Sequence, residues 1–168
     1  MVVVGAARSG IAAAELLHRR GARVVLTERR EDFDQASALK SAGIDVELGG
    51  HSQATFEQAD LVVTSPGVPL EEPTLVAAKR RGVEVIGELE LAPRWVRGRV
   101  IAVTGTKGKS TTTTLLGRMV AADGRRVLVG GNIGVPLSSQ VDDSTPETIH
   151  AVEVSSFQLE TTTTFRPW

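Results

Sequence analysis

Short runs of apolar, mostly β-branched residues recur through about the first 90 positions, and between them apolar residues return every three or four positions. The short runs are bounded by glycine and predict buried strands, whereas the longer spacing predicts amphipathic helices. Regular alternation of the two predicts an α/β fold with a parallel sheet covered on both faces. Strands are expected at residues 2–4, 23–27, 45–48, 61–64 and 83–86, and helices at residues 9–20, 33–42 and 75–81.

A second strand-and-helix pattern begins after a segment that contains Trp95, Arg97 and Gly98. We interpret this segment, residues 94–99, as a hinge between domains at residues 1–93 and 100–168. Three parallel strands bury too little apolar surface for a comfortable domain. We therefore expect the second domain to be partial and the chain to be a fragment. Its strands are expected at residues 100–103, 126–129 and 149–154, and its helix at residues 109–122.

The composition narrows the functional classes more than it narrows the fold. Of 168 residues, 41% are hydrophobic, which is enough for a core, and the formal net charge is −1. So balanced a charge gives no electrostatic reason to expect nucleic acid or an anionic membrane as a partner. The absence of cysteine excludes disulfides, thiolate metal sites and cysteine nucleophiles. No apolar run approaches the roughly 20 residues of a membrane span and no secretion signal is recognisable, so a cytoplasmic protein is expected.

A phosphate-binding loop pattern follows the strand expected at residues 100–103. It reads Gly105, Thr106, Lys107, Gly108, Lys109, Ser110 and Thr111. A glycine-rich turn between a strand and a helix directs backbone N–H groups at phosphate oxygens, and the helix adds its positive end. In such a loop Lys109 reaches the β- and γ-phosphates of ATP, and the hydroxyl of Ser110 or Thr111 holds Mg²⁺. The usual pattern has glycine where this chain has Val103, so the loop is a shortened variant; the alternative is a turn that binds nothing.

A second glycine-rich turn, residues 5–10, joins the first expected strand to the first expected helix. It departs from the dinucleotide fingerprint at Ala7, where that pattern has glycine, and a tight turn without a ligand is the alternative. Glu28 ends the second expected strand, where a carboxylate can meet a ribose or a base, and Gly67 follows the fourth strand on the same rim. A ligand of this turn would be a nucleotide diphosphate. The first domain is therefore expected to be Rossmann-like.

Two later segments carry further candidate residues. Asn132 lies in a glycine-rich segment, residues 130–134, that can place amides against an anionic substrate, although a plain turn explains the pattern equally well. Glu153 lies near the end of the strand expected at residues 149–154. A carboxylate at a strand end beside a phosphate loop can bind Mg²⁺ directly or through water. A structural glutamate is the alternative.

Taken together, these motifs resemble the Mur ligase family, the ATP-dependent enzymes that build the peptide of bacterial peptidoglycan. The loop at residues 105–111 is similar to the variant phosphate loop of that family. Residues 65–67, 130–134 and 153–160 resemble the members that add D-glutamate, and the string Ser-Ser-Phe-Gln-Leu-Glu at residues 155–160 is the most specific part. Two positions depart from the family pattern: Lys107, where asparagine is frequent, and Ala7, where glycine is common.

The resemblance implies a fold, in which a Rossmann-like domain precedes the start of a P-loop-type α/β ATP-binding domain, and it implies roles for individual residues. The pocket for the UDP part of the substrate would be lined by Arg8, Ser9, Glu28, Arg29, Arg30 and Gly67. Lys109 would bind the ATP phosphates and act with Glu153 in catalysis, while the magnesium ligands would be Ser110, Thr111 and Glu153. The substrate between its pyrophosphate and its alanyl end would be contacted by Asn132, Ser155 and Gln158.

The resemblance also implies a reaction. In this family the alanyl carboxylate of UDP-N-acetylmuramoyl-L-alanine attacks the γ-phosphate of ATP, and D-glutamate then displaces phosphate from the acyl phosphate. ATP and Mg²⁺ are thus the expected cofactors, and the two small molecules are the expected partners of a monomer that binds neither nucleic acid nor a membrane. The family's His-containing magnesium motif, its carbamate-bearing lysine and its third domain lie outside residues 1–168, so we expect no turnover by the chain alone.

Two other functional classes stay open. An NAD(P)-type oxidoreductase would use the first domain but would leave the phosphate loop without a role. A non-catalytic nucleotide-binding module would use ATP only to change conformation, and it would have less need of Glu153 as a second magnesium position. Folylpolyglutamate synthases share a similar loop, but that resemblance provides no UDP-type first domain. Titration with NAD(H) and with UDP separates the oxidoreductase from the ligase.

Overall fold

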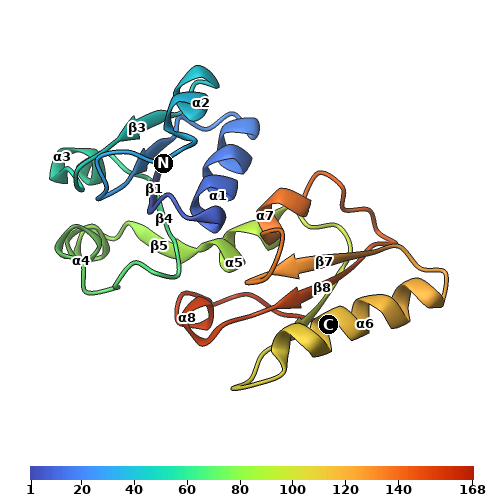
Figure 1. Cartoon of the computed structure of the whole chain (residues 1–168). Helices are drawn as coiled ribbons and strands as arrows, with labels where there is room; N and C mark the ends of the chain where they lie inside the picture. Colours follow the sequence, from blue (N-terminus) through green and yellow to red (C-terminus); the bar gives the residue numbers. More distant parts are fainter. The chain divides into compact units, whose positions relative to one another are not determined.

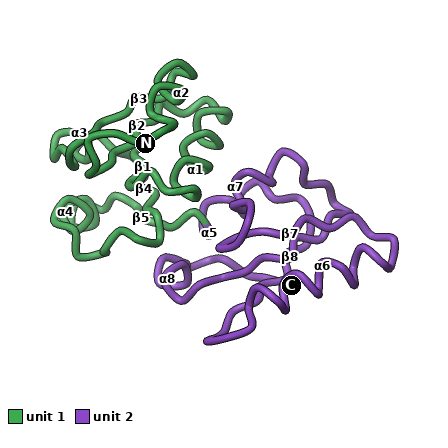
Figure 2. The backbone as a smooth tube through the Cα atoms, viewed as in Figure 1, with its two compact units in different colours: residues 1–88 green, residues 89–168 purple.

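The computed structural model describes residues 1–168. The chain folds into two compact units, residues 1–88 and residues 89–168 (Figure 2). Both units are parallel α/β folds, which confirms the predicted fold class. The division falls inside the short helix α5 (Glu88–Leu91), upstream of residues 94–99, and a hinge at that segment stays a prediction. Among the helices, none combines the length and the apolar character that a bilayer crossing requires.

Unit 1 is a five-stranded parallel sheet with helices in its connections (Figure 1). The sheet order is β3-β2-β1-β4-β5, so the direction in which strands are added reverses between β1 and β4. In open α/β sheets, ligands bind at the carboxyl ends of the strands beside such a reversal. The strands are β1 (Val2–Val4), β2 (Val25–Thr27), β3 (Asp45–Glu47), β4 (Leu61–Thr64) and β5 (Glu84–Gly87), and the helices are α1 (Arg8–Arg19), α2 (Ala36–Ser41), α3 (Gln53–Glu57) and α4 (Pro73–Arg80).

The central strand β1 supplies the middle of the core of unit 1. Val2, Val3 and Val4 are each at most 2% exposed. Val2 is paired with Val25 on one side and with Val62 on the other, so the strand has neighbours along both edges. Fully burying a valine side chain stabilises a fold by roughly 1.5–3 kcal/mol. The apolar run that predicts this strand therefore also accounts for its central position.

Unit 2 contains a three-stranded parallel sheet in the order β6-β8-β7. Every residue of the middle strand β8 is buried, whereas the two outer strands are partly exposed. Because β8 lies between β6 and β7, its last residue lies between the carboxyl ends of both neighbours. The strands are β6 (Arg99–Val103), β7 (Val127–Gly131) and β8 (Ile149–Glu153), and the helical elements are η1 (Ala92–Arg94), α6 (Lys109–Ala122), α7 (Leu137–Gln140) and α8 (Ser156–Leu159).

Several helices differ from the sequence prediction. The helix expected at residues 33–42 begins only at Ala36, because Phe33 lies in a turn where its N–H donates to Asp32 Oδ1 at 2.8 Å. The one-turn helices α3, α5, α7 and α8 were not predicted. An element of four or five residues is too short to display the 3.6-residue period on which such a prediction depends.

Strand β7 is longer than predicted. It includes Gly130 and Gly131, which were expected to follow the strand as part of a turn. A Cβ atom on Gly131 would lie 2.4 Å from the carbonyl oxygen of Glu153. Glycine is therefore needed at this position for close pairing with β8, and the glycine pair has a structural role within the strand.

A buried carboxylate connects α5 to the last residues of the chain. Glu90, which is 4% exposed, accepts hydrogen bonds from the backbone N–H groups of Thr163, Thr164 and Phe165 at 3.0, 2.8 and 3.0 Å. The hydroxyls of Thr163 and Thr164 donate to the same carboxylate. Burial raises the pKa of Glu90, but the hydrogen bonds outweigh burial and lower the pKa from 4.5 to about 2. The ionised carboxylate thus holds the segment that follows α8.

Candidate functional site

A pocket of about 240 Å³ opens at the carboxyl ends of four strands of unit 1. Pockets that enclose a drug-sized ligand measure roughly 300–1,000 Å³, so this one has room for part of an extended ligand. Its lining comes from four separate loops: Gly5 and Ala7 after β1, Glu28, Arg29 and Arg30 after β2, His51 after β3, and Ser65, Gly67, Val68 and Pro69 after β4.

The turn between β1 and α1 brings backbone N–H groups to this pocket. A Cβ atom on Gly10 would lie 2.0 Å from the carbonyl oxygen of Gly5 and 2.5 Å from Ser65 Oγ, so only glycine lets α1 pack this closely on the turn. This is the role of the last glycine in the dinucleotide fingerprint. Ala7 has a φ of −83° and is the N-cap of α1, with no side chain capping the helix. No side chain therefore competes with an anion for the N-terminus of α1.

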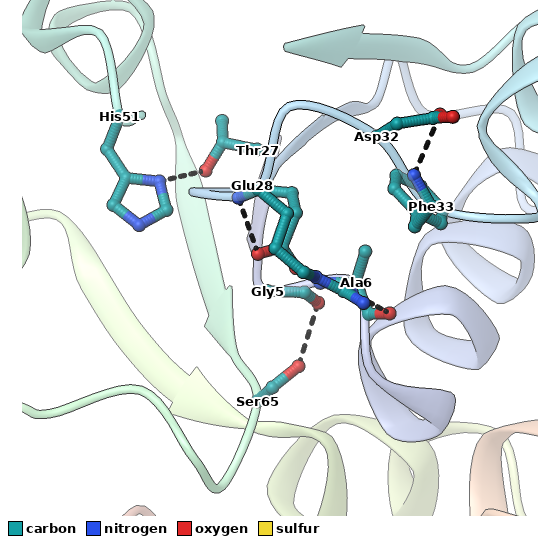
Figure 3. A network of polar contacts seen from close by, with 9 residues as sticks. Gly5, Ala6, Thr27, Glu28, Asp32, Phe33, His51 and Ser65 are labelled. Atoms are coloured by element: carbon teal, nitrogen blue, oxygen red, sulfur yellow. Dashed lines mark hydrogen bonds and ion pairs between the residues drawn. The ribbon is translucent and has the colours of Figure 1, made fainter. Parts of the chain in front are cut away.

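Glu28 contacts the same turn from the side of β2 (Figure 3). Ala6 N–H donates to Glu28 Oε2 at 2.7 Å, and the backbone and guanidinium of Arg30 donate to the two carboxylate oxygens at 3.1 and 3.2 Å. Burial raises the pKa of Glu28, but the hydrogen bonds from Arg30 and Ala6 outweigh it and lower the pKa from 4.5 to about 2. At neutral pH this carboxylate only accepts hydrogen bonds. It therefore suits hydroxyl or N–H groups of a ligand and disfavours a phosphate at its own position.

Of the other residues expected around UDP, some line the pocket and some do not. Arg29 and Gly67 line the pocket. The guanidinium of Arg29 is paired with Glu72, the N-cap residue of α4. Arg8 and Ser9 begin α1 and are not among the lining residues. They directly follow Ala7, which does line the pocket.

Ser65 and His51 line the pocket but were not predicted as site residues, although Ser65 belongs to the motif at residues 65–67. Ser65 donates from Oγ to the carbonyl oxygen of Gly5 at 2.9 Å, which joins the loops after β1 and β4. His51 lies in the loop after β3, and its Nδ1 is 2.8 Å from Thr27 Oγ1. Both residues follow strands that the apolar pattern predicts, so the rule that selected Glu28 could have selected them as well.

In unit 2, the glycine-rich turn between β6 and α6 leaves a helix end uncapped. Gly108 is the N-cap of the 14-residue helix α6 with a φ of +77°, a conformation that favours glycine, and no side chain caps the helix. The turn at residues 104–108 is exposed. Its position between a strand and a long helix agrees with the geometry required of a phosphate loop.

The polar side chains of this turn differ in their contacts. The ammonium group of Lys109 donates to the carbonyl oxygen of Gly105 at 2.8 Å and so folds back over the turn. Ser110 Oγ donates to Glu153 Oε2 at 2.6 Å. The side chains of Lys107 and Thr111 are exposed and make no hydrogen bond within the chain. Of the two hydroxyls considered for magnesium, that of Ser110 is the one that contacts a carboxylate.

Glu153 lies where the three strand ends of unit 2 meet. Its register partners are Val103 on β6 and Gly131 on β7. The residue is 2% exposed, and its carboxylate accepts from Ser110 Oγ and from Asn132 Nδ2, the latter at 2.8 Å. Both of these donors are neutral. A buried carboxylate gains most from a cationic partner, so this cluster is electrostatically suited to a positive ion.

The donor set fits magnesium better than a softer metal. Glu153, Ser110 and Asn132 offer carboxylate, hydroxyl and amide oxygens, which are the ligands of hard divalent cations. The chain has no group of three or more His, Cys, Asp or Glu side chains that could hold an ion. Magnesium commonly completes its shell with water and substrate phosphates around one or two carboxylates. One carboxylate beside a phosphate loop meets that requirement.

A buried hydrogen-bond chain supports the turn that carries Asn132. Ser144 Oγ accepts from the N–H groups of Arg97 and Gly98, so its own proton goes to His150 Nε2 at 2.9 Å. His150 Nδ1 then carries the proton and donates to Gln140 Oε1 at 3.0 Å. The amide of Gln140 in turn donates to the carbonyl oxygen of Val135, at 3.3 Å. Burial lowers the pKa of His150, so the neutral ring that this chain requires is the favoured form.

Ser155 and Gln158, both expected at the substrate, form a capping box at the start of α8. Gln158 N–H donates to Ser155 Oγ at 3.2 Å, and Ser155 N–H donates to Gln158 Oε1 at 3.0 Å. This reciprocal pair satisfies two helix-terminal donors. The structure therefore gives both residues a local role, and their contact with a substrate stays a prediction.

Known proteins share both the sequence and the fold of this chain. A profile of the family "Mur ligase MurD-like, N-terminal domain" matches residues 1–87. Two sequence relatives match 99% of this chain, and both are UDP-N-acetylmuramoylalanine--D-glutamate ligases. The one from Anaeromyxobacter dehalogenans is 52% identical to this chain, and the one from Acidobacterium capsulatum is 48% identical. The chain covers 36% and 37% of the length of these relatives.

A solved structure supports the fold independently. The UDP-N-acetylmuramate:L-alanyl-gamma-D-glutamyl-meso-diaminopimelate ligase from Neisseria meningitides superposes with a TM-score of 0.61 at 20% identity, over 99% of this chain and 55% of that protein. At that identity the likeness concerns the fold alone, whereas the family profile spans more than half of the chain. From the profile and the sequence relatives together, we conclude that this chain belongs to the MurD-like Mur ligase family.

Proposed function

We propose that this chain is the UDP-binding unit and the phosphate-loop unit of an ATP-dependent ligase of peptidoglycan precursor synthesis. The ligase would add D-glutamate to UDP-N-acetylmuramoyl-L-alanine and act as a monomer in the cytoplasm. The observation that carries the proposal is the cluster of Glu153, Ser110 and Asn132 beside an uncapped, glycine-rich helix start. The substrate pair is that of the ligases to which the chain is similar in sequence.

The proposed reaction has two steps. The alanyl carboxylate attacks the γ-phosphorus of ATP, which gives an acyl phosphate and ADP. The amine of D-glutamate then attacks the acyl carbon, which forms the amide and releases phosphate. Neither step needs a protein nucleophile, so the residues act by positioning and by charge neutralisation.

The residues of unit 2 would divide this work. N–H groups of residues 105–111 would hold the phosphates, and Lys109 would neutralise the charge that develops on them. Ser110, Thr111 and Glu153 would hold magnesium, which supplies electrophilic assistance at the phosphoryl oxygens when bound. Asn132, together with Ser155 and Gln158, would orient the substrate between its pyrophosphate and its carboxylate.

The contacts of unit 1 support a nucleotide diphosphate as its ligand. The N–H groups at the start of α1 can bind phosphate. The carboxylate of Glu28 is ionised and can accept hydrogen bonds from a nucleoside. Titration of the 168-residue chain with UDP and with NADH, followed by calorimetry and by nicotinamide fluorescence, tests the proposal. We expect UDP to bind and NADH not to bind; the reverse result would favour the oxidoreductase.

Replacing Glu28 by alanine is expected to weaken UDP binding about tenfold, the effect of losing one or two hydrogen bonds. The change removes the acceptor for Ala6 N–H and the carboxylate to which the guanidinium of Arg30 donates. Binding of Mg·ATP should be unchanged, because Glu28 belongs to unit 1. Glu31→Ala is the matched control, since Glu31 is exposed and makes no hydrogen bond. Equal UDP affinities for the two variants would exclude Glu28 from the site.

A further inference from the structure

His51 is the pocket residue that the proposed chemistry has not used. Its ring lies in the loop after β3, beside Thr27 (Figure 3). His51 is one of the residues that line the pocket of unit 1. Two contacts fix the ring: Nδ1 is 2.8 Å from Thr27 Oγ1, and the edge of the ring meets Phe56, with 6.3 Å between ring centroids. Nε2, on the opposite edge, makes no hydrogen bond within the chain. The ring is thus held in place with one polar atom unused.

The proton of the neutral ring can be assigned from the burial of Thr27. Thr27 is fully buried, and His51 Nδ1 is the single partner of its hydroxyl. If Nδ1 donated to that hydroxyl, the hydroxyl proton would be buried without an acceptor, which is costly. The hydroxyl therefore donates to Nδ1, and the ring proton lies on Nε2. Burial, helped by the nearby charge of Arg29, lowers the pKa of His51 despite the carboxylates of Glu72, Glu28 and Glu47, which favours the neutral ring.

The order of the strands indicates which part of a nucleotide His51 would face. Phosphate groups belong at the turn after β1, because it leads into the N-terminus of α1, which no side chain caps. Glu28 follows β2, the next strand, and its acceptor oxygens suit ribose hydroxyls. His51 follows β3, which is two strands, or roughly 10 Å, from β1. Moving outward from β1, the loops thus match phosphate, ribose and base in turn.

We propose that His51 contacts the ligand directly, donating a hydrogen bond from Nε2–H to a carbonyl oxygen of the pyrimidine base, and that Thr27 is the positioning residue that fixes its tautomer. The proposal rests on the proposed function, because it assumes that the pocket holds UDP. It adds a residue that selects the base, whereas Glu28 would recognise the ribose and the β1–α1 turn would recognise the phosphates.

The test compares ligands that contain successively less of the nucleotide. Calorimetric titration of the wild-type chain and of His51→Ala would use UDP, ribose 5-phosphate and inorganic pyrophosphate. We expect His51→Ala to weaken UDP binding about three- to tenfold, the effect of one neutral hydrogen bond, and to leave the other two ligands unaffected. His51→Gln keeps an N–H donor and should recover part of the affinity. An equal loss for ribose 5-phosphate or pyrophosphate would overturn the contact with the base.

A spectroscopic readout separates a direct contact from a structural role. In ¹⁵N NMR spectra of the wild-type chain, His51 should be a single Nε2–H tautomer at pH 7. Thr27→Val, which is nearly isosteric, should give a mixture of tautomers and a smaller loss of UDP affinity than His51→Ala. A single Nδ1–H tautomer in the wild-type chain would overturn the assignment.

The same titration distinguishes the two proposals. A wild-type chain that binds UDP as tightly as His51→Ala does would overturn this inference alone. A wild-type chain that binds no UDP would overturn the proposed function and the inference together.

Discussion

Replacing Lys109 by alanine is expected to abolish ligation once the chain is completed to the length of its relatives, with phosphate release falling at least about 1,000-fold. Positioned cations and donors at a phosphoryl group contribute factors of this size to the rate. Lys109 is the first residue of α6, and its ammonium group already reaches back over the turn to the carbonyl oxygen of Gly105. A bound γ-phosphate would offer that ammonium a stronger partner than a carbonyl oxygen. Phosphate release with all three substrates is the measurement.

Lys107 provides a matched control in the same turn. It carries the same charge, but it is exposed and makes no hydrogen bond. Lys107→Ala should therefore cost less than about tenfold, the effect of a screened surface charge. If Lys109→Ala kept more than a tenth of the wild-type rate, or if the two variants were equally impaired, the turn would not be the phosphate site that we propose.

Glu90→Ala is expected to destabilise unit 2 by about 3 kcal/mol. The shift of the pKa of this carboxyl from 4.5 to about 2 corresponds to a stabilisation of that order. The residue is nearly fully buried, so solvent screens its hydrogen bonds little. Because a chain of two units need not unfold in one step, hydrogen exchange at single amides is the measurement. The N–H groups of Thr163, Thr164 and Phe165 should lose about 100-fold in protection.

Glu90 also predicts a dependence of stability on pH. A carboxyl with a lowered folded-state pKa stabilises the fold above its unfolded-state pKa, and this contribution is lost as the pH falls towards the folded-state pKa. The contribution of Glu90 should thus be complete above pH 4.5 and lost between pH 4.5 and about 2. Glu90→Gln should flatten the decline over that window, whereas Glu147→Ala, which removes an exposed carboxylate, should not. Unchanged exchange at residues 163–165 in Glu90→Ala would contradict both expectations.

The elements of the fold were largely predictable because their signals are local. The apolar runs at residues 2–4 and 61–64 coincide with β1 and β4, and the helix expected at residues 109–122 coincides with α6. These segments are long or regular enough to show a period. The short helix α8 is held by the reciprocal pair of Ser155 and Gln158, a local contact that the period cannot reveal.

The candidate site was predictable only where its residues adjoin a predicted strand or a recognised motif. Glu28 and Gly67 were selected because they follow strands, and the structure brings them into the lining of one pocket. His51 also follows a predicted strand, but its role depends on a contact with Thr27, 24 residues away along the chain, and it was not selected. Glu90 was missed for the same reason, since its partners lie more than 70 residues downstream.

By itself, the sequence determined the two α/β patterns, the glycine-rich turns and the membership of a ligase family, because these depend on neighbouring residues. The tertiary structure decided that β8 lies between β6 and β7, which brings Glu153 to Ser110 and Asn132. It also decided which nitrogen of His51 contacts Thr27 and which amides Glu90 holds. Strand order and hydrogen-bond partners are set by packing between distant segments, and no local pattern of apolar and polar residues encodes them.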